Sequence, residues 1–247
     1  MSEPSGMRAV ILAGGKGTRL KPFTATLPKP LVPVGDRSIL DIVLLQLRSV
    51  GVTHVTMAVN HLAHLIMAYF GDGSQSGLKI DYSLEDKPLS TIAPLKLVKD
   101  LPETFFVMNG DVLTDLDFSD LYRTHLANDA DITVATFERD AQIDFGVLKS
   151  DEAHRIIDFE EKPTFHFSVS MGVYVISRRL LDIVPEGRPF GFDHLMHTCI
   201  AQKRKAMCYP HRGSWLDIGR PDDYEAANEK SAELLRRLFP EGEPPRP

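Results

Sequence analysis

The chain has 247 residues, of which 43% are hydrophobic and 25% charged, as is typical of a globular protein. This composition excludes intrinsic disorder for most of the chain, and the length suits one large α/β domain or two small ones. Because 28 Lys and Arg face 34 Asp and Glu, the net charge of −6 gives no general attraction to nucleic acid or anionic membranes.

Two cysteines, Cys199 and Cys208, are too few for a disulfide framework, and no Cys/His spacing suggests a zinc site. The N-terminus does not have the pattern of a signal peptide, and no apolar stretch approaches the roughly 18 residues of a membrane span. We therefore expect a protein of the reducing cytoplasm with no nucleic acid and no membrane as partner.

The first half of the chain predicts strands that alternate with helices, because short apolar runs are followed by stretches of helical spacing. Strands are expected at Met7–Leu12, Val52–Val59, Leu78–Tyr82, Thr104–Met108 and Ile132–Phe137. Helices are expected at Ser38–Val50, Leu62–Phe70 and Phe118–Asn128.

Beyond Phe137 the pattern changes to successive strands without long helices between them, which indicates an antiparallel extension. These strands are expected at Phe145–Lys149, Arg155–Phe159 and Val169–Ile176. Helices near Arg178–Ile183, Asp193–Gln202 and Asp222–Leu238 close the chain. The sequence thus predicts a Rossmann-like α/β three-layer sandwich with a mixed, mostly parallel sheet and a small antiparallel extension. We expect one domain over residues 1–239 and a flexible Pro-rich tail over 240–247.

A glycine-rich segment, LAGGKGTRL at residues 12–20, follows the first strand. Its three glycines let the backbone approach a ligand and point N–H groups at an anion, although neither the Walker A nor the GxGxxG pattern fits. A tight connection between strand and helix is the alternative interpretation. Nearby basic residues favour a phosphate ligand: Arg8, Lys16, Arg19, Lys21 and Lys29. Prolines on both sides of Lys29 stiffen the backbone that presents it.

LAGGKGTRL followed by LPKPLVPVG resembles the signature of the sugar-1-phosphate nucleotidylyltransferases, also called nucleotide-sugar pyrophosphorylases. Five more motifs follow in the family's order, at Val107–Asp111, Phe145–Val147, Glu160–Pro163, Met171–Tyr174 and Trp215–Gly219. The resemblance extends to about Glu229 and is strongest to the short GDP-mannose and GDP-heptose pyrophosphorylase-like members. It implies an Mg²⁺-dependent transferase that joins a nucleoside triphosphate and a sugar 1-phosphate into an NDP-sugar, a precursor of polysaccharides or glycoconjugates, and releases pyrophosphate.

The two aspartates Asp111 and Asp217 are the candidate metal ligands. Asp111 directly follows a predicted strand, where open α/β sheets bind ligands, and Mg²⁺ prefers one or two carboxylates with phosphate oxygens and water. Taken singly, Asp111 could be a turn former and Asp217 a capping or ion-pairing residue. The resemblance assigns both positions to the metal.

The resemblance also implies two substrate sides and an in-line attack without a covalent intermediate or general base, since the attacking phosphate oxygen is already ionised. Nucleotide contacts are expected at Leu12, Ala13, Gly14, Gly15, Gly17, Thr18, Arg19, Lys29, Glu85, Ser90, Asn109 and Gly110. Sugar-phosphate contacts are expected at Gly146, Glu161, Lys162, Met171 and Gly172. The residues expected to act directly in catalysis are Arg19, Lys29, Asp111 and Lys162.

The base-reading segment departs from the family. Where relatives commonly read Leu-Gly-Thr-Ala-Gly-Pro-Leu, residues 89–95 have Ser90 and Ala93 in place of both glycines. The carboxylate of the preceding Glu85 could accept two donors from a guanine edge, which uracil and thymine do not offer, so we expect a preference for GTP. Two alternatives stay open: transfer to a non-sugar acceptor such as choline phosphate, or a non-catalytic nucleotide-sugar-binding subunit. The sequence leaves the sugar and the oligomeric state open, and a homo-oligomer is compatible with it.

Overall fold

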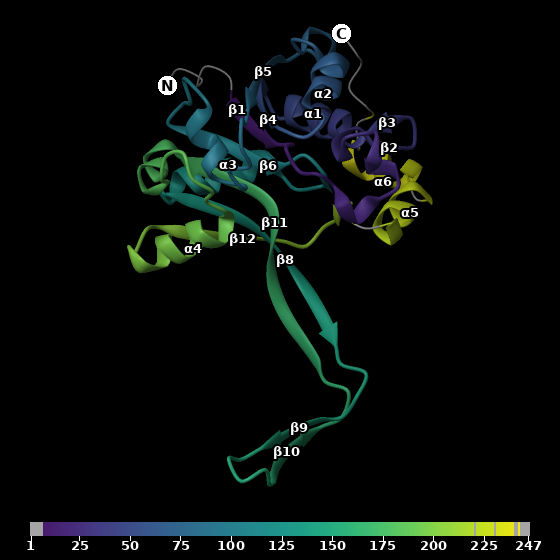
Figure 1. The fold of residues 1–247 in the computed structure, drawn as a ribbon, viewed down its shortest axis with the longest axis vertical. Coiled ribbons are helices and arrows are strands. Elements are labelled where there is room, and N and C mark those ends of the chain that lie inside the picture. The colour runs from purple at the N-terminus through teal and green to yellow at the C-terminus, as the bar shows by residue number, and fades with distance from the viewer. Residues whose placement is uncertain (1–6, 220, 230, 240–241, 243–247) are drawn as a thin grey trace.

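The computed structural model describes residues 7–219, 221–229, 231–239 and 242, and it is built around a seven-stranded sheet (Figure 1). The strand order is β12-β8-β11-β6-β1-β4-β5. The bounds are β1 Met7–Leu12, β4 Val52–Val59, β5 Lys79–Leu84, β6 Thr104–Asn109, β8 Ile132–Gln142, β11 Thr164–Ser177 and β12 Ala206–His211. Only β11 runs antiparallel to its neighbours in this sheet, which confirms the mixed, mostly parallel sheet.

Helices cover both faces of this sheet. The α-helices are α1 Ile39–Ser49, α2 Ala63–Phe70, α3 Phe118–Ala127, α4 Phe192–Ala201, α5 Pro221–Glu229 and α6 Ser231–Leu238. Short 3-10 helices lie at Thr18–Leu20, Phe23–Ala25, Lys29–Leu31, Ser74–Ser76, Ala93–Leu97 and Arg178–Ile183. Three two-stranded sheets complete the fold: β2 Pro33–Val34 with β3 Arg37–Ser38, β7 Val112–Thr114 with β13 Trp215–Asp217, and β9 Val147–Ser150 with β10 Ile156–Glu160. Among the described helices, none combines the length and hydrophobicity that crossing a membrane requires.

The alternation of side chains along β1 shows how the layers form. Ala9 and Ile11 point into one hydrophobic core, together with apolar residues of α1, α2, α3, α5 and α6. Val10, between them, points into a second core that includes Leu195 and Cys199 of α4. Because both faces of the central strands β1 and β6 are buried, these two strands are largely apolar runs without polar alternation.

The two longest strands leave the body of the protein. β8 and β11 pair from Ile132 with Ile176 to Gln142 with Thr164, with a register shift between Ser170 and Tyr174. Their outer halves run beyond the central sheet as a two-stranded ribbon that continues into β9 and β10 (Figure 1). We call residues 138–168 the arm. The antiparallel extension expected from the sequence is therefore present, and it projects away from the body.

The structure differs from the prediction at the closing helix and at one additional strand, and it shows which type of helix forms at Arg178–Ile183. The single closing helix expected at Asp222–Leu238 is two helices, α5 and α6, and the second begins at Ser231, a residue type common at helix starts. Arg178–Ile183 is a 3-10 helix. β12 was not predicted. It contains Pro210, which has no N–H for the sheet, and the structure accommodates this proline because β12 is at the sheet edge. The expected tail at 240–247 falls, apart from residue 242, outside the described residues.

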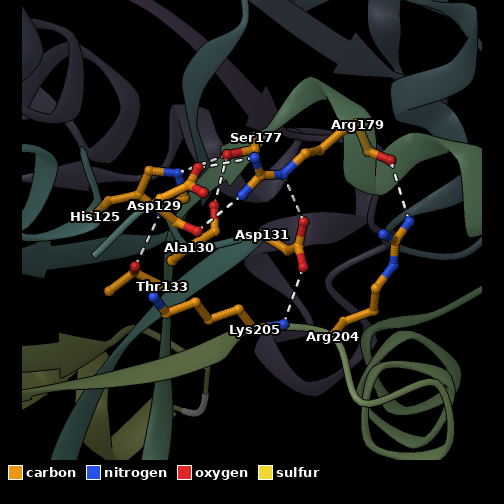
Figure 2. Close-up of polar contacts among 9 residues, drawn as sticks. All are labelled: His125, Asp129, Ala130, Asp131, Thr133, Ser177, Arg179, Arg204 and Lys205. Carbon is orange, nitrogen blue, oxygen red and sulfur yellow. Dashed lines mark hydrogen bonds and ion pairs between the residues drawn. The ribbon is translucent and has the colours of Figure 1, made fainter. Parts of the chain in front are cut away.

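A buried polar network fixes the start of β8 against α3 and the end of β11 (Figure 2). The ring of His125, 1% exposed, lies 2.9 Å from Thr133 Oγ1 and 3.0 Å from Ser177 Oγ. Asp131 accepts hydrogen bonds from Arg179 Nε at 2.7 Å and from the backbone N–H of Lys205 at 2.9 Å. Burial lowers the pKa of His125 to about 4, so this histidine is neutral at pH 7.

Candidate active site

The carboxyl ends of four parallel strands meet at one edge of the central sheet. β6, β1, β4 and β5 end at Asn109, Leu12, Val59 and Leu84. Glycine or polar residues follow each end closely: Gly110 and Asp111 after β6, Gly14 after β1, Asn60 after β4 and Glu85 after β5. Ligands of open α/β sheets bind at this edge, so the topology alone brings the candidate groups together.

Contacts within the glycine loop after β1 fix its backbone conformation. Gly17 has a φ of 58°, and a Cβ there would lie 2.9 Å from Thr24 Cγ2, so this position requires glycine. Thr24 Oγ1 donates to the Gly17 carbonyl at 2.7 Å and fixes this turn. A Cβ on Gly15 would have no described atom within 4 Å, which leaves space for a ligand against the loop backbone.

The loop borders a cavity of about 410 Å³ at the strand ends. Ten of the predicted residues line it: Leu12, Ala13, Gly14, Gly15, Lys29, Glu85, Ser90, Asn109, Gly110 and Asp111. Gly17, Thr18 and Arg19 were predicted with them but are not among its lining residues. The cavity is thus built largely from the residues that the sequence motifs indicated.

Four other lining residues were not predicted for the site: Pro30, Ala58, Asn60 and Pro88. Three more come from indicated segments, since Lys16 is one of the basic residues that favour a phosphate and Thr91 and Pro94 belong to the base-reading segment. The sequence could have indicated Asn60, because it is the first polar residue after β4, which pairs in parallel with β1. Its side-chain N–H donates to the Glu85 carbonyl at 3.1 Å and ties together the loops that follow β4 and β5.

Glu85 is fixed close to the glycine loop. One carboxylate oxygen, Oε2, accepts a hydrogen bond from the Leu89 N–H at 2.9 Å. The other, Oε1, lies 3.2 Å from where a Cβ on Gly14 would be. Burial raises the pKa of Glu85 above its usual range. Ser90 follows with a φ of 68°, a left-handed conformation that favours glycine.

Lys29 is a buried cation at the start of its short 3-10 helix. Pro28 precedes it and Pro30 follows, and 10% of its side chain is exposed. Its ammonium contacts Asp111 Oδ2 and lies 3.7 Å from Asp217 Oδ1. The lysine therefore joins two carboxylates from segments more than a hundred residues apart.

Two chain segments place those carboxylates. Asp111 follows β6, and Asp217 ends β13, which pairs with β7 so that Asp217 lies opposite Val112. The Ile218 N–H donates to the Asp111 carbonyl at 3.2 Å. The antiparallel clasp of β7 and β13 thus returns the C-terminal segment to the ligand edge, as expected from the sequence.

The surroundings of the Asp111 carboxylate favour the binding of a further cation. Burial raises its pKa, while the ammonium of Lys29 opposes that rise. Its Oδ1 atom is buried and has no hydrogen-bond partner among the described residues. Mg²⁺ takes one or two protein carboxylates and completes its shell with phosphate oxygens and water. The unpartnered Oδ1 and the adjacent Asp217 fit that ligand set, whereas no group of three or more His, Cys, Asp or Glu gathers as a metal site in the described part of the chain.

Arg19 approaches the same place from the glycine loop. A Cβ on Gly219 would lie 3.5 Å from Arg19 Nη2 and 3.4 Å from Asp217 Oδ1. Arg19 therefore lies beside Asp217 and does not line the cavity at the strand ends.

The residues predicted for the sugar-phosphate side fall into two groups. Met171 and Gly172 are in the body, where Gly172 has a φ of 75° and a Cβ would lie 2.5 Å from Asn109 Nδ2. Gly146, Glu161 and Lys162 are on the arm. The stretch of β11 from Thr164 to Val173, at about 3.3 Å per residue, spans roughly 30 Å. Within one chain, the structure does not bring the arm residues to Asp111.

Comparison with known proteins identifies relatives of this chain. A family model described as nucleotidyl transferase matches residues 8–233. The mannose-1-phosphate guanylyltransferase of Mycobacterium tuberculosis is 33% identical over 240 residues, which cover 94% of this chain and 66% of that protein. A probable mannose-1-phosphate guanylyltransferase 1 of Oryza sativa is 32% identical, with 95% and 67% covered. The chain spans about two thirds of the length of these relatives.

Solved structures agree on the fold. HddC from Yersinia pseudotuberculosis, also solved in complex with GMP-PN, is 26% identical, with a TM-score of 0.71 over 91% of this chain and 99% of that one. A putative glucose-1-phosphate thymidylyltransferase from Bacillus anthracis, 23% identical, has a TM-score of 0.70 over 90% and 94%.

Proposed function

The chain belongs to the nucleotidyl transferase family, and we propose that it condenses a nucleoside triphosphate, preferably GTP, with a sugar 1-phosphate to give an NDP-sugar and pyrophosphate. The observation that carries the proposal is the meeting of Lys29 with Asp111 and Asp217 beside an open glycine loop. Loop N–H groups and basic side chains suit a triphosphate, and paired carboxylates suit the Mg²⁺ that accompanies it.

In the proposed reaction, a phosphate oxygen of the sugar 1-phosphate attacks the α-phosphorus of the triphosphate. The bond from that phosphorus to the oxygen bridging to the β-phosphate breaks, and pyrophosphate leaves. The attacking oxygen is ionised near neutral pH, so no general base is needed. Positioning and charge neutralisation supply most of the rate in such transfers.

Each group has a proposed role. The backbone around Gly14, Gly15 and Gly17, with Thr18 and Arg19, holds the triphosphate, and Lys29 neutralises it. Asp111 and Asp217 are the proposed protein ligands of Mg²⁺, which when bound neutralises phosphate charge. Lys162 holds the sugar phosphate and Glu161 the sugar hydroxyls.

Glu85 is the proposed reader of the base. A carboxylate accepts two donors from the guanine edge, and the Glu85 side chain lines the cavity next to the loop. The names of the relatives, mannose-1-phosphate guanylyltransferases, agree with guanine and make mannose 1-phosphate the first sugar to test.

Pyrophosphate release from a substrate panel tests the proposal. GTP, UTP, dTTP, CTP and ATP would each be paired with mannose, glucose and heptose 1-phosphates and with choline phosphate. We expect release only with Mg²⁺ present, fastest with GTP and a sugar 1-phosphate. Faster turnover of a pyrimidine triphosphate would overturn the base assignment, and choline phosphate as the best acceptor would overturn the sugar assignment.

A further inference from the structure

The arm exposes large apolar side chains that no other described part of the chain covers. Of fourteen large hydrophobic residues exposed among the described residues, eight are on the arm: Ile143, Phe145, Leu148, Ile156, Ile157, Phe159, Phe165 and Phe167. A two-stranded ribbon is marginally stable by itself in water, and exposed apolar patches of this kind mark interaction surfaces.

The exposed area is sufficient for a specific interface. Large apolar and aromatic side chains bury about 150–250 Å² each when fully covered, so eight that are roughly half exposed offer on the order of 800 Å². That is about the area that each partner contributes to a standard protein–protein interface.

The arm leaves the body at the ligand edge of the sheet. Val173 of β11 pairs with Met108, next to the carboxyl end of β6, and the residues from Ser170 outward extend beyond that end. The arm therefore starts beside the cavity and carries its tip away from it (Figure 1).

The junction between the β8–β11 ribbon and the β9–β10 hairpin is packed within a single chain. A Cβ on Gly146 would lie 2.5 Å from the Phe159 ring and 3.2 Å from Glu161 Oε2, so ring and carboxylate pack directly on the glycine backbone. Lys162 has a φ of 46°, a strained conformation for lysine. Such backbone strain is concentrated at functional sites.

Charge also favours contact between an arm and a glycine loop. The arm, residues 138–168, contains eight Asp or Glu and four Lys or Arg, a net charge of −4. Residues 13–35 contain no acidic residue, and three of their basic residues are exposed: Lys16, Arg19 and Lys21. Lys29 is buried against Asp111 and Asp217. Because an arm points away from its own loop, a second copy of the chain offers the complementary surface.

We propose that two copies of this chain exchange arms, so that Glu161 and Lys162 of each complete the site at Asp111 and Lys29 of the other. The inference rests on the proposed function, since it supplies the sugar-phosphate residues that the body lacks. In such a dimer every site contains the body of one copy and the arm of its partner, and the interface is two-fold symmetric.

Complementation between two defective full-length variants tests the exchange. Asp111→Asn damages the body and Lys162→Gln the arm, and each alone should lose most of the wild-type activity. Co-expressed in equal amounts, half of the dimers would contain both variants, each with one intact site, so about a quarter of the wild-type rate should return. A mixture as inactive as its components, with an active wild type, would overturn the exchange.

Light scattering provides a readout independent of activity. We expect the wild type at twice the mass of one chain, and Phe145→Ser with Ile157→Ser should shift it to a single chain. Ile200→Ser, which alters an exposed isoleucine on α4, is the matched control and should remain dimeric. A wild type that stays a single chain at tens of micromolar would overturn the proposal. A dimeric wild type that releases no pyrophosphate would instead overturn the proposed function alone.

Discussion

Lys29 and Asp111 form a buried ion pair, with 10% and 22% of their side chains exposed. A buried charge without its partner is strongly unfavourable, so each of the two groups depends on the other. Lys29 also lies 3.7 Å from Asp217 Oδ1, so it links the segment after the glycine loop to both carboxylates. The ion pair therefore connects the packing at this edge of the sheet with the proposed phosphate site.

Asp111→Asn should reduce the turnover number by on the order of 100-fold or more, because one proposed metal ligand loses its charge. The shape of the side chain is kept and Asp217 remains 3.7 Å from the Lys29 ammonium as a counter-charge, so far-UV circular dichroism should match that of the wild type. Steady-state pyrophosphate release measures the effect, and Asp36→Asn, an exposed aspartate, is the control. Near-normal turnover of Asp111→Asn would remove Asp111 from the metal site.

Glu85→Gln should lower kcat/KM for GTP about 10- to 100-fold, because hydrogen bonds to a charged group contribute about 1.5–3 kcal/mol. The amide oxygen can still accept the Leu89 N–H, which keeps the local fold. Values for UTP and dTTP, which offer no matching pair of donors, should change little. An equal loss for all triphosphates would indicate that Glu85 supports the cavity without reading the base.

Ser90→Gly should raise the free energy of unfolding by about 0.5–1 kcal/mol, because the left-handed backbone costs serine about 1–2 kcal/mol and glycine almost nothing. The greater freedom of glycine in the unfolded chain offsets part of this gain. Urea unfolding measures the change. Ser90→Ala keeps the unfavourable φ and should bring no gain, so equal stabilisation by both variants would contradict the strain argument.

His125 should make stability dependent on pH. Its pKa is about 4 in the folded protein, against an ordinary histidine pKa of 6.5, so the unfolded chain binds the proton first. Stability is then fully present above about pH 6.5 and falls as the pH drops toward 4, by about 3 kcal/mol from this residue. In His125→Gln that part of the loss should disappear, whereas His197→Gln, an exposed control, should retain it. Identical slopes in all three proteins, measured by urea unfolding from pH 7 to 4, would rule out this origin.

The strands of the body could be predicted from the sequence because their hydrophobic patterns match the way they are buried in the fold. Strands such as Met7–Leu12 and Val52–Val59 are largely apolar since both faces are buried, and their bounds agree with the structure. Asp111 could be placed at the ligand edge because a strand ends just before it. The same rule applied to β4 would have indicated Asn60 as well.

The direction and reach of the arm could not be predicted from the local sequence pattern. Its strands were expected, but their direction depends on how far β8 and β11 pair beyond the central sheet, and residue type does not encode that reach. For the same reason the motifs at Gly146 and Lys162 indicated a site without indicating that they lie far from Asp111 in one chain. The division of 222–238 into two helices likewise depends on packing, since Tyr224 of α5 and Leu234 of α6 are each buried.

The four strand ends described above divide the cavity among separate connections. Asp111, the glycine loop, Asn60 and Glu85 each follow a different strand of the central sheet. The Asn60–Glu85 hydrogen bond links two of these connections, so a substitution there would affect both, whereas Lys29 and Asp111 are held by their own ion pair. Under the proposed function, base preference can therefore change through residues 85–95 while the proposed phosphate site at Lys29 and Asp111 is retained.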